Sequence, residues 1–504
     1  MKQKDIETLA IALPEDILKA KWCGDFDRAF HLIDLYLANE KVPAFMKTRL
    51  ALEREVLKAL PTDYTYSEED ALALVQKEIP DFTKAELDAL RDRGAIDWIY
   101  INGKTTYSRT FYDTLLGVYP DIATRAGKPP KDKSDRVEFL RQNVRDMKKD
   151  GDALWSIQLR AQFRLHDDVF RPGEELTVHL PVPKNAMNMR DIEILATSHP
   201  IYKLADENAP ARTVSFRGKF EKNETFWVEY KYLSYVKYNN LESAQVSAEQ
   251  PTFDTEELYP HIRFTPLIRA LCKELSGNEK NPLLLARRFY DYCTKVGTYS
   301  YVREYFALPG SIPDYYGAGL HGDCGVQALL FITLCRCAGI PARWQSGLFV
   351  TPDDTGCHDW AQFYIAPYGW LFADPSFGGS AHRMGDSERN DFYFGNLDPF
   401  RMAANSELQA DFDPPKTQLR IDPFDNQRGE AEYADAGIRW MDKECDWKTI
   451  EMKKLSSFKT LNARRAFARA GIFDRKGTDL WKRNSIFCGA ISVTRPFAAV
   501  RRKL

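Results

Sequence analysis

The N-terminal part of the chain carries apolar residues at helical spacing. Phe30, Ile33 and Leu37 follow the three- and four-residue intervals that place side chains on one face of a helix. Residues 50–60 show a similar spacing. The pattern predicts a helical hairpin or small bundle over residues 1–65.

Residues 66–150 combine helix starts with a hairpin signal. Ser67 precedes three acidic residues, and Thr83 with Glu86 forms a capping-box pattern. Asn102-Gly103 lies between two strand-like runs, which is typical of a type I′ hairpin. Two helices followed by a hairpin outline a winged-helix-like unit, with a linker behind it. Basic and acidic residues alternate along this unit, so a phosphate-binding stripe is missing and nucleic-acid binding is not expected.

The period changes to two after residue 152. Apolar and polar residues alternate between Ile157 and Leu165, as in a half-buried antiparallel strand, and further strand-like runs follow. The pattern predicts a β-sandwich over 153–237. Amphipathic helices return after about residue 255. The last part of the chain, 426–504, is expected to be a basic segment, because residues 441–504 hold 16 Lys and Arg but 6 Asp and Glu.

Composition narrows the class of protein. The 504 residues carry 70 Lys and Arg against 72 Asp and Glu, so no global field attracts nucleic acid or anionic membranes. Uncharged runs long enough for a signal peptide or a membrane span are absent, which predicts a cytoplasmic protein. Nine scattered cysteines favour reduced thiols over a disulfide framework.

One cysteine occupies a position that favours reactivity. His321-Gly322-Asp323-Cys324 precedes a nearly continuous apolar run that ends at Gly339 and Pro341, the pattern of a buried helix. Cys324 then lies at the helix N-terminus, where unpaired N–H groups and the helix dipole lower a thiol pKa. Cys335 and Cys337, at the opposite end, are expected to be core thiols.

A cysteine nucleophile needs a base and a group that orients it. His358 and Asp374 lie on either side of a hairpin turn and share a face only if paired residue numbers sum to an even value. A three-residue loop with Gly369 in the left-handed region would set Asp374 opposite Gln362. A loop centred on Ala366, or a bulge, would set it opposite His358.

Other residues offer weaker chemistry. Cys335 and Cys337 point to different sides of a helix and no second Cys pair exists, so a metal site is not expected. His321 and His382 lack an obvious orienting carboxylate. Asp359 should point to the strand face opposite His358, which makes it a poorer partner than Asp374.

Five motifs, taken together and in order, resemble the transglutaminase-like superfamily. They are Gly322-Asp323-Cys324, Leu334-Cys335-Arg336-Cys337-Ala338-Gly339-Ile340-Pro341-Ala342-Arg343, His358-Asp359-Trp360, Tyr368-Gly369-Trp370 and Asp374-Pro375. The resemblance covers about 255–425. It implies a multidomain α+β protein in which a papain-like transglutaminase core follows the β-sandwich and the N-terminal helical region.

The resemblance also implies roles for individual residues. Cys324 becomes the nucleophile, His358 the general base and then acid, and Asp374 the group that orients the imidazole. The Cys324 N–H is a natural oxyanion donor. Tyr299 or Tyr301 is expected to supply a second donor, with Tyr301 preferred. Further aromatic residues are candidates for the cleft wall; these are Tyr315, Tyr316, Trp344 and Trp360.

The expected function is cysteine-dependent acyl transfer on protein or peptide amides through a thioester. By analogy with multidomain members of the superfamily, hydrolysis is favoured: water as the acceptor makes the protein a peptidase or amidase. The alternative is an amine acceptor, which makes it a protein-glutamine transglutaminase. A catalytically silent binding scaffold is the alternative from a different class, and DNA binding through residues 66–110 is a third. The chemistry requires no cofactor. Substrate identity, oligomeric state and the role of the basic segment stay open.

Overall fold

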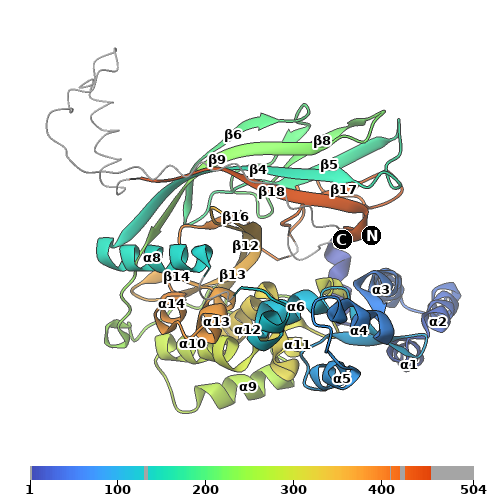
Figure 1. The fold of residues 1–504 in the computed structure, drawn as a ribbon, viewed down its shortest axis with the longest axis horizontal. Coiled ribbons are helices and arrows are strands. Elements are labelled where there is room, and N and C mark those ends of the chain that lie inside the picture. The colour runs from blue at the N-terminus through green and yellow to red at the C-terminus, as the bar shows by residue number, and fades with distance from the viewer. Residues whose placement is uncertain (1–2, 130–133, 409, 421–425, 456–504) are drawn as a thin grey trace.

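The computed structural model describes residues 3–129, 134–408, 410–420 and 426–455. The protein combines helices and sheets (Figure 1), and its helical and β-rich parts lie on different sides of the molecule. Among the helices of the described part of the chain, none is long and apolar enough to cross a membrane.

The chain begins with short helices. They are η1 (Gln3–Ala10), α1 (Glu15–Trp22), α2 (Phe26–Ala38) and α3 (Ala44–Asp63). Asp25 caps α2 by accepting a hydrogen bond from the Arg28 N–H. Ile33 is fully buried, as its helical spacing predicts, and packs in one core with residues of α1 and α3.

The hairpin predicted at Asn102-Gly103 is present, and the chain itself covers its tip. The surrounding elements are β1 (Tyr64–Ser67), α4 (Glu68–Gln76), α5 (Lys84–Asp92), β2 (Trp98–Ile101) and β3 (Lys104–Ser108), with strand order β1-β3-β2. Both turn residues have positive φ, as a type I′ turn requires. The Asn102 N–H donates to the Gly24 carbonyl oxygen over 2.9 Å. Lys84 of α5 forms ion pairs with Glu68 and Asp88. Three helices follow, α6 (Phe111–Val118), α7 (Pro120–Arg125) and α8 (Asp135–Asp150).

Two four-stranded sheets pack against each other in the β-rich part. Their strands are β4 (Asp152–Leu165), β5 (Glu175–Pro181), β6 (Met189–Thr197), β7 (Lys203–Leu204), β8 (Thr213–Lys219), β9 (Phe226–Lys237), β17 (Glu430–Glu432) and β18 (Lys443–Lys454). The orders are β17-β5-β8-β7 and β18-β4-β9-β6. The rings of Phe216 and Phe226, one from each sheet, lie 5.8 Å apart between centroids.

Two of these strands correct the expected division of the chain. The sequence analysis ends the β-rich unit at residue 237 and treats 426–504 as a separate basic segment. In the structure β17 pairs with β5, and β18 pairs with β4 along almost its whole length. The charged side chains of β18 alternate with partly buried ones, because one face of the strand covers the sheet. Residues 456–504 of the predicted basic segment lie outside the described residues.

Between β9 and β17 the chain forms an α+β unit built around a five-stranded sheet. The sheet order is β15-β14-β13-β12-β16, with β12 (Ala342–Val350), β13 (Thr355–Ile365), β14 (Gly369–Ala373), β15 (Phe394–Gly395) and β16 (Arg401–Asn405). The surrounding helices and small strands are η3 (Ser243–Gln245), α9 (Pro266–Ser276), α10 (Pro282–Asp291), η4 (Tyr292–Val296), β10 (Thr298–Tyr299), η5 (Tyr305–Ala307), α11 (Ile312–Gly319), β11 (His321–Gly322), α12 (Cys324–Cys337), α13 (Pro375–Arg383) and α14 (Ser387–Phe392). Another short helix, η6 (Trp440–Asp442), directly precedes β18 of the β-rich part. Helix α12 lies against β13, where the rings of Phe331 and Phe363 are 5.6 Å apart.

Candidate active site

Helix α12 begins at Cys324 and is capped by the residue before it. Asp323 Oδ1 accepts hydrogen bonds from the Val326 N–H at 3.1 Å and the Tyr305 hydroxyl at 2.7 Å. Burial raises the pKa of Asp323 to about 6, although these two hydrogen bonds oppose the increase. The helix ends as expected, since Gly339 follows it with φ of 78°.

The Cys324 thiol meets a carboxylate. Its Sγ donates to Asp359 Oδ2 over 3.2 Å, and the residue is 9% exposed. Burial, followed by the negative charges of Asp359 and Asp323, raises the pKa of the Cys324 thiol well above its ordinary value. The expectation of a lowered pKa is therefore wrong for this arrangement. The helix N-terminus is present, but burial and two nearby carboxylates raise the pKa of the thiol.

His358 and Asp374 form a buried pair. His358 Nε2 lies 2.8 Å from Asp374 Oδ2, and the two side chains are almost inaccessible to solvent. Burial lowers the pKa of His358, against the attraction of Asp374. Burial also disfavours the charged form of Asp374, but His358 and Arg401 outweigh it and lower its pKa to about 2.

The paired residue numbers of the hairpin sum to an even value, as the parity condition requires. The register is neither of the two considered from the sequence, which set Asp374 opposite Gln362 or His358, but lies between them. Ile365 pairs with Gly369 and Ala361 with Ala373, so the sum is even and three residues form the loop. Gly369 has φ of 82°, in the left-handed region. One step further along the ladder, Asp374 aligns with Trp360. It therefore reaches His358 as a diagonal neighbour on the same face.

Cys324 and the His358–Asp374 pair lie on different faces of the sheet. Successive side chains of β13 alternate, so His358 faces Asp374, whereas Asp359 faces α12. Among the described residues, no hydrogen bond joins Cys324 to His358. The sulfur nevertheless lies beside the strand residue that follows His358, since the Asp359 backbone N–H also hydrogen-bonds to it.

A glutamine from a distant part of the chain holds Asp359. Gln427 Nε2 donates to Asp359 Oδ1 at 2.8 Å and to the His358 carbonyl oxygen at 3.0 Å. The Gln427 side chain is buried. Sequence reasoning missed this residue, because no local pattern connects residues 358 and 427.

The expected cleft aromatics divide into exposed and buried residues. Tyr301 is 44% exposed. Its neighbour Tyr299 is more enclosed: burial raises the pKa of its hydroxyl well above the usual value, and the Cys324 thiolate acts in the same direction. Trp344 and Trp360 are 2% and 0% exposed. They are core residues and do not form a cleft wall, because Trp344 pairs with Ala361 inside the sheet and Trp360 Nε1 donates to Gln345 Oε1.

The remaining chemical candidates lie apart from this site. His321 contacts the Tyr315 hydroxyl and the Gly319 carbonyl oxygen. Cys335 is buried in the core. In the part of the chain that the structure describes, no group of three or more His, Cys, Asp or Glu side chains could hold a metal ion.

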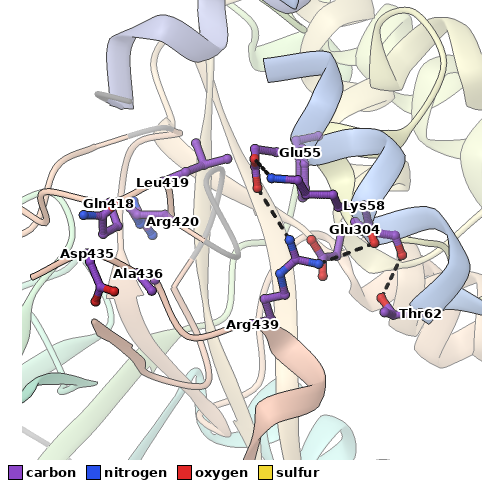
Figure 2. A pocket seen from close by; sticks show the side chains of 13 residues that line it. Glu55, Lys58, Thr62, Glu304, Gln418, Leu419, Arg420, Asp435, Ala436 and Arg439 are labelled. Carbon is purple, nitrogen blue, oxygen red and sulfur yellow. Dashed lines mark hydrogen bonds and ion pairs between the residues drawn. The ribbon is translucent and has the colours of Figure 1, made fainter. Parts of the chain in front are cut away.

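A cavity of about 420 Å³ lies between α3 and the segment around residues 418–439. Figure 2 shows Arg439 extending toward Glu55 and Lys58 across it. Among the side chains that line the cavity, Glu55 forms ion pairs with both Lys58 and Arg439, and none of the predicted catalytic residues lines it.

Comparison with known proteins supports the identification of the core. Residues 269–375 match the family described as the Transglutaminase-like superfamily. The uncharacterized protein YebA of Bacillus subtilis (strain 168) is 23% identical over 181 residues, which cover 32% of this chain. The chain spans about a quarter of the length of that relative, 24%.

Two solved structures show a remote likeness. A candidate cysteine protease from Cytophaga hutchinsonii is 13% identical and has a TM-score of 0.36, with 61% of this chain and 92% of that chain covered. The periplasmic domain of TgpA from Pseudomonas aeruginosa is 15% identical and has a TM-score of 0.26, with 46% and 92% covered. The match over residues 269–375 and the motifs within it identify this part of the chain as a domain of the Transglutaminase-like superfamily.

Proposed function

We propose that the protein is a cysteine-dependent enzyme that transfers acyl groups from protein or peptide amides through a thioester on Cys324, with water as the acceptor. The observation that carries the proposal is the buried hydrogen bond between His358 and Asp374, one strand residue away from the thiol. A neutral imidazole that donates through Nε2 to a carboxylate keeps Nδ1 as its proton acceptor. Among the described residues, Nδ1 of His358 has no hydrogen-bond partner.

Because Cys324 and the His358 side chain lie on different faces of the sheet, the reaction requires residues 358–359 of β13 to rearrange so that the thiol exchanges Asp359 for His358. Nδ1 then takes the proton from Sγ, and the thiolate attacks the amide carbonyl carbon. His358 returns the proton to the leaving nitrogen, so the amine departs and a thioester remains on Cys324. A water molecule gives its proton to His358 and attacks the thioester, which releases the acid and restores the thiol. Asp374 stabilises the imidazolium in both steps.

Two groups are suited to stabilise the oxyanion. The Cys324 N–H lies in the first turn of α12, where backbone donors lack helical partners. For the second donor we now favour Tyr299 over Tyr301, because its hydroxyl is enclosed near Cys324 and remains protonated. Water needs no second binding site, whereas a transglutaminase must also bind an amine, so we retain amine transfer as the alternative.

One observation favours a silent scaffold as the second candidate. The thiol is protonated and bonded to Asp359, an arrangement that resists alkylation as well as catalysis. The scaffold hypothesis holds that this arrangement persists when a partner binds. The catalytic proposal holds that it is a resting state.

Alkylation of Cys324 separates the two. Iodoacetamide labelling followed by peptide mass spectrometry is measured between about pH 4 and 10, around the thiol reference of about 8.5. The wild type is compared with His358→Ala, Asp374→Asn and the exposed control His382→Ala. We expect His358→Ala and Asp374→Asn to slow labelling near neutral pH and His382→Ala to leave it unchanged. Identical profiles for all four proteins would favour the scaffold. Peptide hydrolysis and incorporation of a fluorescent primary amine then distinguish the acceptors.

A further inference from the structure

A buried arginine adjoins the His358–Asp374 pair on the side away from Cys324. Arg401 lies on β16, next to β12, and its side chain is inaccessible to solvent. Its Nη2 and Nε donate to Asp374 Oδ2 at 2.8 and 3.2 Å. This is the carboxylate oxygen that receives His358 Nε2, so one oxygen joins the imidazole and the guanidinium.

A second carboxylate completes the group. Arg401 Nη1 lies 3.0 and 3.2 Å from the two oxygens of Asp398. Asp398 is itself fixed, because its Oδ2 accepts from the Tyr393 hydroxyl and its Oδ1 from the Phe400 N–H. Asp374 Oδ1 accepts from the Phe377 N–H, which anchors the same carboxylate to the first turn of α13. The carboxylate therefore has its orientation set on both oxygens.

We propose that Arg401, backed by Asp398, is a positioning residue that fixes the Asp374 carboxylate toward His358 and places a positive charge beside the pair. The effect of this positioning on catalysis rests on the proposed function, whereas the positioning itself does not. A planar guanidinium suits the role, since it bridges two carboxylates with fixed geometry and stays charged when buried. A buried ion pair also costs desolvation, so its net contribution to stability can be small.

The surroundings of His358 define what the charge of Arg401 does. Charged groups near it are Asp374 at the end of β14, Arg401 on β16 and Asp398 before β16. Arg136 of α8 stacks on Phe349 and Phe377, whose rings also contact His358, and pairs with Asp354. Asp359 lies across the sheet. Arg401 opposes protonation of the imidazole, and Asp398 favours it.

The two neighbours therefore predict shifts of opposite sign. The protein is labelled at its histidine rings and titrated by NMR, with the His358 signal identified by its loss in His358→Gln among the 8 histidines. Arg401→Gln should raise the pKa of His358, because a repelling charge is removed. Asp398→Asn should lower it, because an attracting charge is removed. Arg389→Gln, which alters another buried arginine paired with Asp386, is the matched control.

The outcomes distinguish positioning from mere packing. Opposite shifts, with no shift in the Arg389→Gln control, support the proposal. Shifts of the same sign in Arg401→Gln and Asp398→Asn, or no shift in either, would overturn it, since general loosening moves both variants toward the value of a free histidine. Arg401→Lys keeps the charge but loses the fork, and should leave the titration near that of the wild type while lowering kcat more than it changes KM.

The titration does not depend on turnover. If Arg401→Gln fails to fold, the near-isosteric Asp398→Asn still tests the electrostatic prediction. If both shifts appear but alkylation of Cys324 is indifferent to His358, the proposed function fails and the positioning of the histidine stands. If alkylation depends on His358 but the shifts are absent, the positioning proposal fails and the proposed function stands.

Discussion

At the scale of single residues, Asp359 adds to burial in setting the state of the nucleophile. It presents a carboxylate to the thiol at the helix N-terminus, the place where the backbone itself favours an anion. Burial and this carboxylate both raise the pKa of the thiol. The protonated thiol is the result, and it gives the site a resting form.

Replacing this carboxylate should activate Cys324. In Asp359→Asn the amide carries no charge, so the pKa of the Cys324 thiol falls and iodoacetamide labels it faster near neutral pH. Each unit of pKa corresponds to about a tenfold change in thiolate fraction well below the pKa. The matched control is Asp353→Asn, at an exposed position nearby. Equal labelling rates in Asp359→Asn and the wild type would mean that burial and Asp323, and not Asp359, raise the thiol pKa.

The identity and order of the residues sufficed to predict much of the site. Properties that depend on burial or on distant segments could not be predicted. The motifs place Cys324 at the start of α12, and parity allows His358 to face Asp374. The raised pKa of Cys324 could not be foreseen, because it depends on burial and on how closely the Asp359 face approaches α12. Arg401 and Gln427 reach the site from distant segments, and their local sequence carries no sign of it.

At the scale of elements, the first turn of α12 depends on a neighbour. The Tyr305 hydroxyl donates to Asp323, and the hydroxyl lies so near Gly325 that an added Cβ would be 2.0 Å from it. The glycine is needed for this close approach. The segment around Tyr305 is in turn held by the N-terminal helices, since Glu304 N–H donates to Asp63 at the end of α3 and Arg303 pairs with Asp97.

Removing the Tyr305 hydroxyl should weaken the start of α12. Tyr305→Phe leaves Asp323 with one strong donor fewer, and we expect a loss of about 1 kcal/mol in the free energy of unfolding. The pKa of Asp323 should rise further, because the lost hydrogen bond favours the carboxylate. Urea denaturation measures the first effect, with Tyr100→Phe on the exposed face of β2 as the control. A loss no larger than that of Tyr100→Phe would show that the hydroxyl does not support the cap.

At the scale of the whole molecule, buried ion pairs join the segments of the β-rich part. Glu430 of β17 contacts Lys416 and Arg420, and all three side chains are buried. Burial disfavours its charge, but the two cations outweigh it and lower the pKa of Glu430 to about 2. An unfolded glutamate titrates at about 4.3.

Acid should therefore destabilise the β-rich part of the molecule. The folded pKa lies below the unfolded one, so the stabilisation is complete above about pH 4.3 and is lost as the pH falls toward 2. Glu430→Gln should flatten this dependence and cost about 3 to 5 kcal/mol near neutral pH, because two buried cations lose their partner. Urea unfolding at several pH values measures both effects, with the exposed Glu193→Gln as the control. If the free energy of unfolding of Glu430→Gln falls in acid as steeply as that of the wild type, other carboxylates cause the pH dependence.

Long-range pairing was the part of the architecture beyond sequence reasoning. The strand pattern of residues 153–237 is local, and strands such as β4 and β9 lie within this range. The partners of β5 and β4 come from β17 and β18, where Ala431 meets Val178 and Trp447 meets Ala161. No periodicity within either segment specifies the other as its neighbour.

The order of synthesis follows from these two strands. A ribosome makes β4 and β5 more than two hundred residues before it makes β17 and β18, so both sheets wait with an open edge while the transglutaminase-like core emerges. An open edge invites pairing with other chains. The intervening core can fold first, and the last strands close the sheets only after residue 454 has left the exit tunnel. The β-rich part, although it begins earlier in the sequence, is thus completed after the transglutaminase-like core.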